Sequence, residues 1–117
     1  MRFMVMVKHL ENDPNMPEPD EEMFASMARY NEELVKAGVL LAGEGLHPSD
    51  QGALVTFRDG VPTVTDGPFA EGKELVGGYW LLEVKSREEV LEWVKRIPAD
   101  AAVTSRVEVR QVLSDDD

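Results

Sequence analysis

The chain has 117 residues, 43% of them apolar, with 12 basic and 23 acidic side chains and a formal net charge of −11. This length suits one hydrophobic core, so we expect a single domain over residues 1–113 and a frayed acidic tail at 114–117. The charge opposes binding to nucleic acid or anionic membranes, and the lack of cysteine excludes disulfides and thiolate chemistry. We therefore expect a globular protein of the cytoplasm.

The amino-terminal part alternates between extended and helical patterns. Residues 2–9 (RFMVMVKH) predict a strand that is apolar on both faces, and not a signal segment. A membrane helix is not expected, because no apolar run approaches the roughly 20 residues that it needs. Asp20 is well placed to cap a helix of about 17 residues that ends at Gly38. A short strand at 39–48 follows and breaks up at its glycines.

A β-hairpin is the strongest local prediction. The turn Asp59–Gly60 separates GALVTFR from VPTVT, and both of its residues must take positive φ. With a two-residue loop, Arg58 pairs with Val61 and Ala53 pairs with Asp66. The apolar face of the hairpin then carries Ala53, Val55, Phe57, Pro62, Val64 and Asp66.

The carboxyl-terminal part predicts two strands around a second helix. The segment at 79–84 (YWLLEV) is a strand pattern that is apolar on both faces. Ser86 and Glu89 form a capping box for a helix that Pro98 terminates. The last strand, at 103–112, alternates valine with charged residues, so one of its faces meets water. The buried stripe of the helix is expected to contain Val90, Leu91, Val94 and Ile97.

The order of these elements predicts an α+β fold. Strand, helix, strand, hairpin, strand, helix, strand is a ferredoxin-like plan with an inserted hairpin. Two helices cover only one face of such a sheet, whereas the strands at 3–7 and 79–84 are apolar on both faces. The second face is therefore expected to pack on another subunit, which implies a homodimer.

Asp66 is the first candidate site residue, and its pattern supports two interpretations. If the apolar face of the hairpin is buried, desolvation would disfavour the charged carboxylate and make Asp66 a candidate proton carrier. Asp66-Gly67-Pro68 is also a common turn sequence, in which the carboxylate accepts backbone N–H bonds and Gly67 permits an unusual φ. Turn-capping is the more frequent role of such an aspartate.

The two histidines follow predicted strands and are the other catalytic candidates. His9 ends the first strand and His47 ends the second, so both can border one cleft with Asp66 and form an acid–base set or a weak metal site, and the spacing supports neither specifically. Each imidazole can equally bond a backbone carbonyl in a purely structural role. We predict no metal and no cofactor, because the chain has no H-E-x-x-H motif and no histidine pair at i,i+4.

The connector at 69–78 and the first residue of the strand that follows it supply the candidate ligand-binding residues. Lys73 is a candidate anion holder, with Glu71 and Tyr79 as further ligand-binding candidates, although the charges at 71–74 also suit a hydrated surface turn. Gly77–Gly78 permits either a β-bulge or the close approach of another backbone or ligand.

Two long stretches resemble a known family. YNEELVKAGVLLAGEGLHPS at 30–49 and TVTDGPFAEGKELVGGYWLLEVKSREEVLEWVKRIP at 63–98 are similar to the YCII-related family in its DGPF-containing branch. The resemblance implies a dimeric α+β barrel. Some enzyme-like relatives carry a His–Asp pair whose positions match Met27 and Ile97 here, and neither of these side chains can transfer a proton. The resemblance also suggests a link to extracytoplasmic-function sigma factors.

These observations leave three hypotheses about function. The first is a small-molecule-binding cleft near the DGPF turn, with proton-transfer chemistry such as elimination or isomerisation in which Asp66 pairs with a histidine. The second is a non-enzymatic ligand-binding or regulatory module. In the third, the DGPF turn serves assembly alone. An enzyme needs titratable groups within about 3 Å of one another or of a shared bound atom, whereas a binding module needs only a pocket or a patch.

Overall fold

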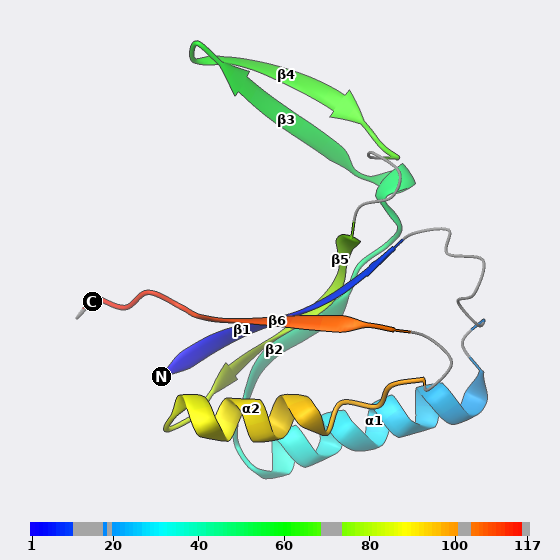
Figure 1. Cartoon of the computed structure of the whole chain (residues 1–117), viewed down its shortest axis with the longest axis vertical. Helices are drawn as coiled ribbons and strands as arrows, with labels where there is room; N and C mark the ends of the chain where they lie inside the picture. Colours follow the sequence, from blue (N-terminus) through cyan, green and yellow to red (C-terminus); the bar gives the residue numbers. More distant parts are fainter. Residues whose placement is uncertain (11–17, 19, 69–73, 101–103, 116–117) are drawn as a thin grey trace.

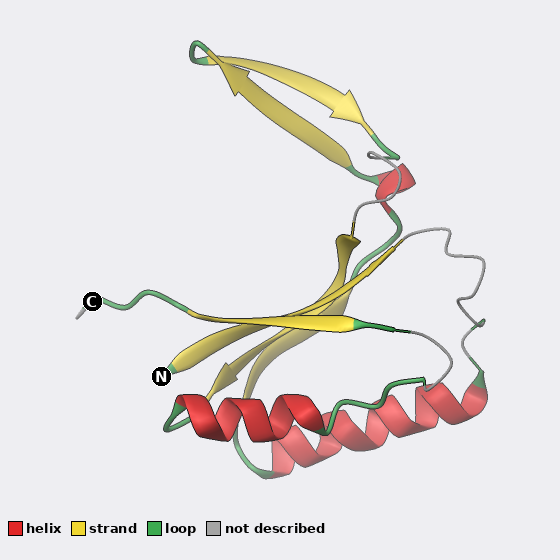
Figure 2. Ribbon diagram, viewed as in Figure 1, coloured by secondary structure: helices red, strands yellow, loops and turns green. Residues whose placement is uncertain are grey.

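The fold comes from a computed structural model that describes residues 1–10, 18, 20–68, 74–100 and 104–115. Four strands form an antiparallel sheet in the order β2-β5-β1-β6, and the hairpin β3–β4 is a separate two-stranded sheet. Both helices lie on one face of the larger sheet (Figure 1; Figure 2). The predicted α+β class is confirmed. The elements are β1 (Arg2–Leu10), α1 (Glu21–Lys36), β2 (Leu40–Gly45), the 3₁₀ turn η1 (Ser49–Gln51), β3 (Ala53–Arg58), β4 (Val61–Asp66), β5 (Glu74–Glu83), α2 (Arg87–Lys95) and β6 (Arg106–Gln111).

Both helices begin at the predicted caps. Asp20 Oδ1 accepts a hydrogen bond of 2.8 Å from the Met23 backbone N–H, and Gly38 follows the end of α1 with φ of 73°. Ser86 Oγ accepts from the Glu89 N–H at 3.1 Å, while the Glu89 carboxylate accepts from the N–H of Lys85 at 2.7 Å. Within the described ranges, no helix is long and apolar enough to cross a membrane.

The hydrophobic core lies between the sheet and the helices. Alternate residues of β1 and β5 point at the helices, and Val5, Leu34, Leu82 and Val90 are fully buried. The predicted stripe of α2 is confirmed, because Leu91, Val94 and Ile97 pack against this core around Val90. Among the described residues, the buried members of this core are Phe3, Val5, Tyr30, Leu34, Val39, Trp80, Leu82, Val84 and Val90.

Tyr30 joins the two helices inside this core. Its hydroxyl donates a 2.7 Å hydrogen bond to the backbone oxygen of Trp93, and its ring meets Trp80 edge-on with centroids 5.6 Å apart. Burial, which disfavours the charged phenolate, raises the pKa of Tyr30 to about 12.

The strand β5 is longer than predicted. It has ten residues and begins at Glu74, whereas the apolar pattern suggested a start at residue 79. Val7 pairs with Gly78 and Lys8 with Val76, so Gly77 is the extra residue of a β-bulge through which the strand continues. The strands β2 and β6 are shorter than predicted, and Val103 of the predicted last strand lies outside the described residues.

The hairpin has the predicted register but projects from the sheet (Figure 1). Asp59 and Gly60 take φ of 51° and 80°, as the turn requires. Every residue of β3 and β4 is exposed. The radius of gyration is 16.3 Å, larger than the about 13 Å expected for a compact chain of this length, which agrees with an arm that extends from the body.

Candidate functional site

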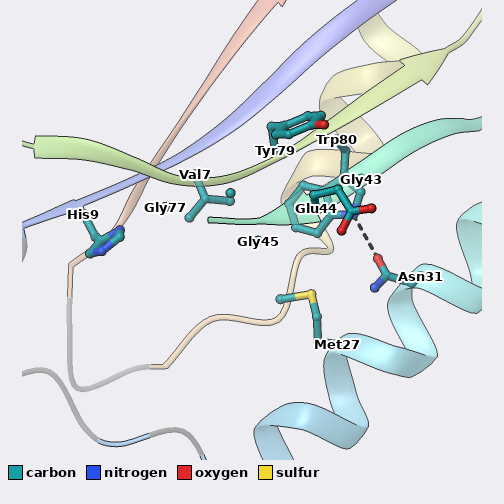
Figure 3. A pocket seen from close by; sticks show the side chains of 11 residues that line it. Val7, His9, Met27, Asn31, Gly43, Glu44, Gly45, Gly77, Tyr79 and Trp80 are labelled. Atoms are coloured by element: carbon teal, nitrogen blue, oxygen red, sulfur yellow. Dashed lines mark hydrogen bonds between the residues drawn. The ribbon is translucent and has the colours of Figure 1, made fainter. Parts of the chain in front are cut away.

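A pocket of about 450 Å³ opens between α1 and the sheet (Figure 3). We call it the α1 pocket. Its volume lies within the range of small-molecule sites, which is about 300–1,000 Å³. The sheet contributes Val7, His9, Gly43, Glu44, Gly45, Gly77, Gly78, Tyr79 and Trp80, and α1 contributes Met27 and Asn31.

Glycines form much of the sheet side of this pocket, and close contacts require most of them. A Cβ atom at Gly43 would lie 2.7 Å from Cδ1 of Trp80, and one at Gly77 would overlap the imidazole of His9. A Cβ atom at Gly78 would lie 3.1 Å from the backbone oxygen of Glu44, so the pair at 77–78 provides both the bulge and the close approach of another backbone that were the two alternatives in the sequence. Gly45 differs, because a Cβ atom there would meet nothing within 4 Å. It borders open space in the pocket.

Asn31 presents hydrogen-bond donors to the α1 pocket. The indole Nε1–H of Trp80 donates to Asn31 Oδ1 at 2.9 Å (Figure 3). Because an indole nitrogen only donates, the Trp80 hydrogen bond fixes Oδ1 of the Asn31 amide toward the indole. Asn31 Nδ2 then keeps its two N–H donors for other partners. Among the described residues, Nδ2 makes no other hydrogen bond. Sequence analysis missed Asn31, although its spacing of four residues from Met27 puts both on one helix face.

His9 lies at the other end of the pocket, over Gly77 (Figure 3). Arg106 of β6 donates three hydrogen bonds to the Glu74 carboxylate of β5, at 2.9, 3.1 and 2.7 Å. These bonds hold the pKa of Glu74 below its ordinary value. Glu74 pairs with Leu10 and Arg106 with Lys8, so this ion pair spans the end of β1 that carries His9.

The three predicted catalytic residues occupy different places. His9 lines the α1 pocket, whereas His47 lines a second pocket of about 380 Å³ at the base of the hairpin. Asp66 pairs with Ala53 of that second pocket, but it is exposed and lines neither cavity. In the described ranges, no three His, Cys, Asp or Glu side chains gather closely enough to hold a metal ion. The acid–base role of these residues stays a prediction.

The remaining candidates are placed as follows. Lys73 and Glu71 lie outside the described residues. Tyr79 contributes to the α1 pocket, but the alternation along β5 turns its side chain to the opposite face from Trp80. Tyr79 is the cross-strand partner of Met6 in the β1–β5 register, and its ligand-binding role also stays a prediction.

The DGPF turn is a tight backbone contact. The Gly67 N–H donates a 2.9 Å hydrogen bond to the Gly52 oxygen, and a Cβ atom at Gly67 would overlap the carbonyl oxygen of Ser49. Gly67 does not take a positive φ, so the conformational freedom that glycine permits is not used at this position. The glycine is needed for space, because the end of β4 packs against η1. Among the described residues, the Asp66 carboxylate accepts no hydrogen bond.

Comparison with known proteins gives the family. Residues 1–114 match the YCII-related domain. The chain belongs to the YCII-related family. An uncharacterised protein of Rhizobium meliloti (strain 1021) is 31% identical over 93 residues, which cover 80% of this chain and 75% of that protein. The resemblance is thus confirmed at the level of the family, while the DGPF-containing branch stays a prediction.

The resemblance matches the His–Asp pair of enzyme-like relatives to Met27 and Ile97. Met27 lines the α1 pocket, and the side chains of both residues pack against the hydrophobic core. Both side chains are apolar and neither transfers a proton.

Proposed function

We propose that this YCII-related domain binds a small organic molecule in the α1 pocket. The observation that carries the proposal is a cavity of about 450 Å³ into which α1 presents the Asn31 amide donors and the Met27 thioether. The side chains of Trp80 and His9, which lie over Gly43 and Gly77, form the facing wall. A mostly apolar cavity with a few convergent polar groups is the usual form of a small-molecule site.

Proton-transfer chemistry, such as elimination or isomerisation, is the finer form of this proposal. Imidazole exchanges protons near neutral pH, and His9 is the histidine that lines the α1 pocket. Asp66 and His47 would join such chemistry only after the exposed hairpin packs against another surface, since Asp66 is exposed in the single chain. Binding does not depend on this step.

A fragment screen tests the binding proposal. ¹H–¹⁵N NMR spectra of the wild type are recorded with a library of small uncharged and charged fragments, and hits are repeated with Gly45→Leu. The leucine side chain extends into the open space beside Gly45 and fills the cavity, whereas Gly45→Ala adds one methyl group and serves as the matched control. We expect binding to weaken at least about tenfold in Gly45→Leu and to persist in Gly45→Ala. Hits that bind both variants equally, or no hits at all, would refute the proposal.

The hairpin favours a second function, assembly with another copy of the chain. Phe57 is 71% exposed and Val64 is 66% exposed, and an isolated two-stranded hairpin is only marginally stable in water. No helix covers the sheet face opposite the core (Figure 1), where half-buried Met6 and Leu81 lie. A symmetric pair of chains would cover both surfaces in each copy. This pairing is our proposed form of the homodimer and of its barrel.

Light scattering tests the homodimer. A mass close to twice the 13.1 kDa of one chain is expected at micromolar concentration, and a mass close to 13.1 kDa would remove the proposal. Val64→Glu should dissociate the dimer, whereas Thr65→Glu on the opposite hairpin face should leave it intact. Because each copy carries a net charge of −11, added salt should strengthen the association. If the chain is a monomer, the exposed hairpin would instead be a surface that binds a different protein, as the regulatory-module hypothesis requires.

A further inference from the structure

We infer that the ligand of the α1 pocket is an uncharged, flat ring compound with a carbonyl oxygen that accepts a hydrogen bond from Asn31 Nδ2. This inference rests on the proposed binding function and names the chemical class of the ligand. It follows from the charge, the donor pattern and the shape of the pocket.

The charge of the pocket disfavours an anion. None of its described lining residues is Lys or Arg, and the carboxylate of Glu44 lies at the sheet edge on the opposite face, beside Tyr79. The nearby Arg106 donates three hydrogen bonds to Glu74, and Lys8 is paired with Glu108 at 3.4 Å. The net charge of −11 adds a repulsive field for any carboxylate that approaches.

The donor pattern calls for an oxygen acceptor. Trp80 occupies the acceptor of Asn31, so the amide can offer only N–H donors to a ligand. A ligand without an acceptor would exclude water from these donors and leave them unpaired. Sites built to form a hydrogen bond therefore discriminate against analogues that lack the partner group.

The shape of the pocket favours a flat ring. The Trp80 indole covers Gly43 and the His9 imidazole covers Gly77, so two aromatic side chains line the sheet side, and Met27 reaches toward the sheet from α1 (Figure 3). Aromatic rings and thioethers both make favourable contacts with a flat ring. Gly77 and Trp80 are three residues apart on β5, or about 10 Å along the strand, which accommodates one or two fused rings.

Three matched naphthalenes test this inference: 2-acetonaphthone has a neutral carbonyl, 2-ethylnaphthalene has no acceptor and 2-naphthoate is an anion. Dissociation constants and the Asn31 side-chain amide shifts are measured by NMR titration. We expect the ketone to bind about fivefold more tightly than either analogue and to shift the Asn31 Nδ2 protons. Asn31→Asp retains an oxygen for the Trp80 N–H and lacks the amide donors, so it should erase the preference of the ketone over 2-ethylnaphthalene.

The outcomes separate this inference from the binding proposal. Equal affinities, tighter binding of the naphthoate, a preference that survives in Asn31→Asp, or no binding of the three probes would each overturn the ligand class. The binding proposal would still stand if screened fragments of other chemistry lose affinity in Gly45→Leu. It fails together with the ligand class if no compound shows that loss.

Discussion

Gly67→Ala should release the hairpin from its base without unfolding the sheet. The new Cβ atom would overlap the Ser49 carbonyl oxygen and lie 2.6 Å from its carbon, about 1 Å inside an ordinary contact. Relief requires the end of β4 to move away from η1. That movement breaks the 2.9 Å hydrogen bond from the Gly67 N–H to the Gly52 oxygen.

The magnitude follows from three contributions. Overpacking costs about 1–3 kcal/mol, the lost hydrogen bond costs about 1 kcal/mol, and reduced freedom of the unfolded chain offsets about 0.4–1 kcal/mol. We therefore expect the opening free energy of the hairpin to fall by about 1–3 kcal/mol. This corresponds to exchange of the β3 and β4 amide hydrogens that is about 5- to 150-fold faster.

Hydrogen exchange measured by NMR reads this effect residue by residue. Amides of β1 and β5 should keep their exchange rates, because the hairpin forms a sheet of its own. Gly45→Ala is the control, since its Cβ atom meets open space and hairpin exchange should not change. Unchanged hairpin exchange in Gly67→Ala would show that the contact with Ser49 does not hold the turn.

Two further predictions concern the core. Leu34 has 0% exposure, so Leu34→Ala should lower the free energy of unfolding, measured in urea, by about 2–5 kcal/mol. The neighbouring Val35 is 62% exposed, so Val35→Ala should lower it by less than about 1 kcal/mol. Similar losses in the two variants would contradict the assigned core. The pKa of Tyr30 is raised from 10.0 to about 12. The contribution of Tyr30 to the free energy of unfolding is therefore fully present below pH 10 and is lost as the pH rises toward 12. Two pH units correspond to about 2.7 kcal/mol, and screening lowers this to about 1–2 kcal/mol. Thermal unfolding of Tyr30→Phe should lack this part of the alkaline loss, and an equal loss in both proteins would contradict the assignment.

The sequence was sufficient for features that depend on neighbouring residues. Asp20 and Ser86 cap helices because each oxygen reaches an N–H three residues ahead. Asp59–Gly60 determines the hairpin register in the same local way, since a two-residue loop leaves one pairing of the strands. The alternation of apolar residues also identified the α+β class and most of the core, and the motif at 63–98 identified the family.

Only the tertiary structure decided where the candidate site lies. The α1 pocket combines Asn31 of α1 with Gly43 of β2 and His9 of β1, and their proximity depends on strand pairing and on the bulge at Gly77. No local signal encodes that pairing, because it results from burial of side chains distant in the chain. The exposure of Asp66 could not be predicted from the sequence for the same reason. The hairpin register determines which face a residue occupies, but the packing of the hairpin determines whether that face is buried.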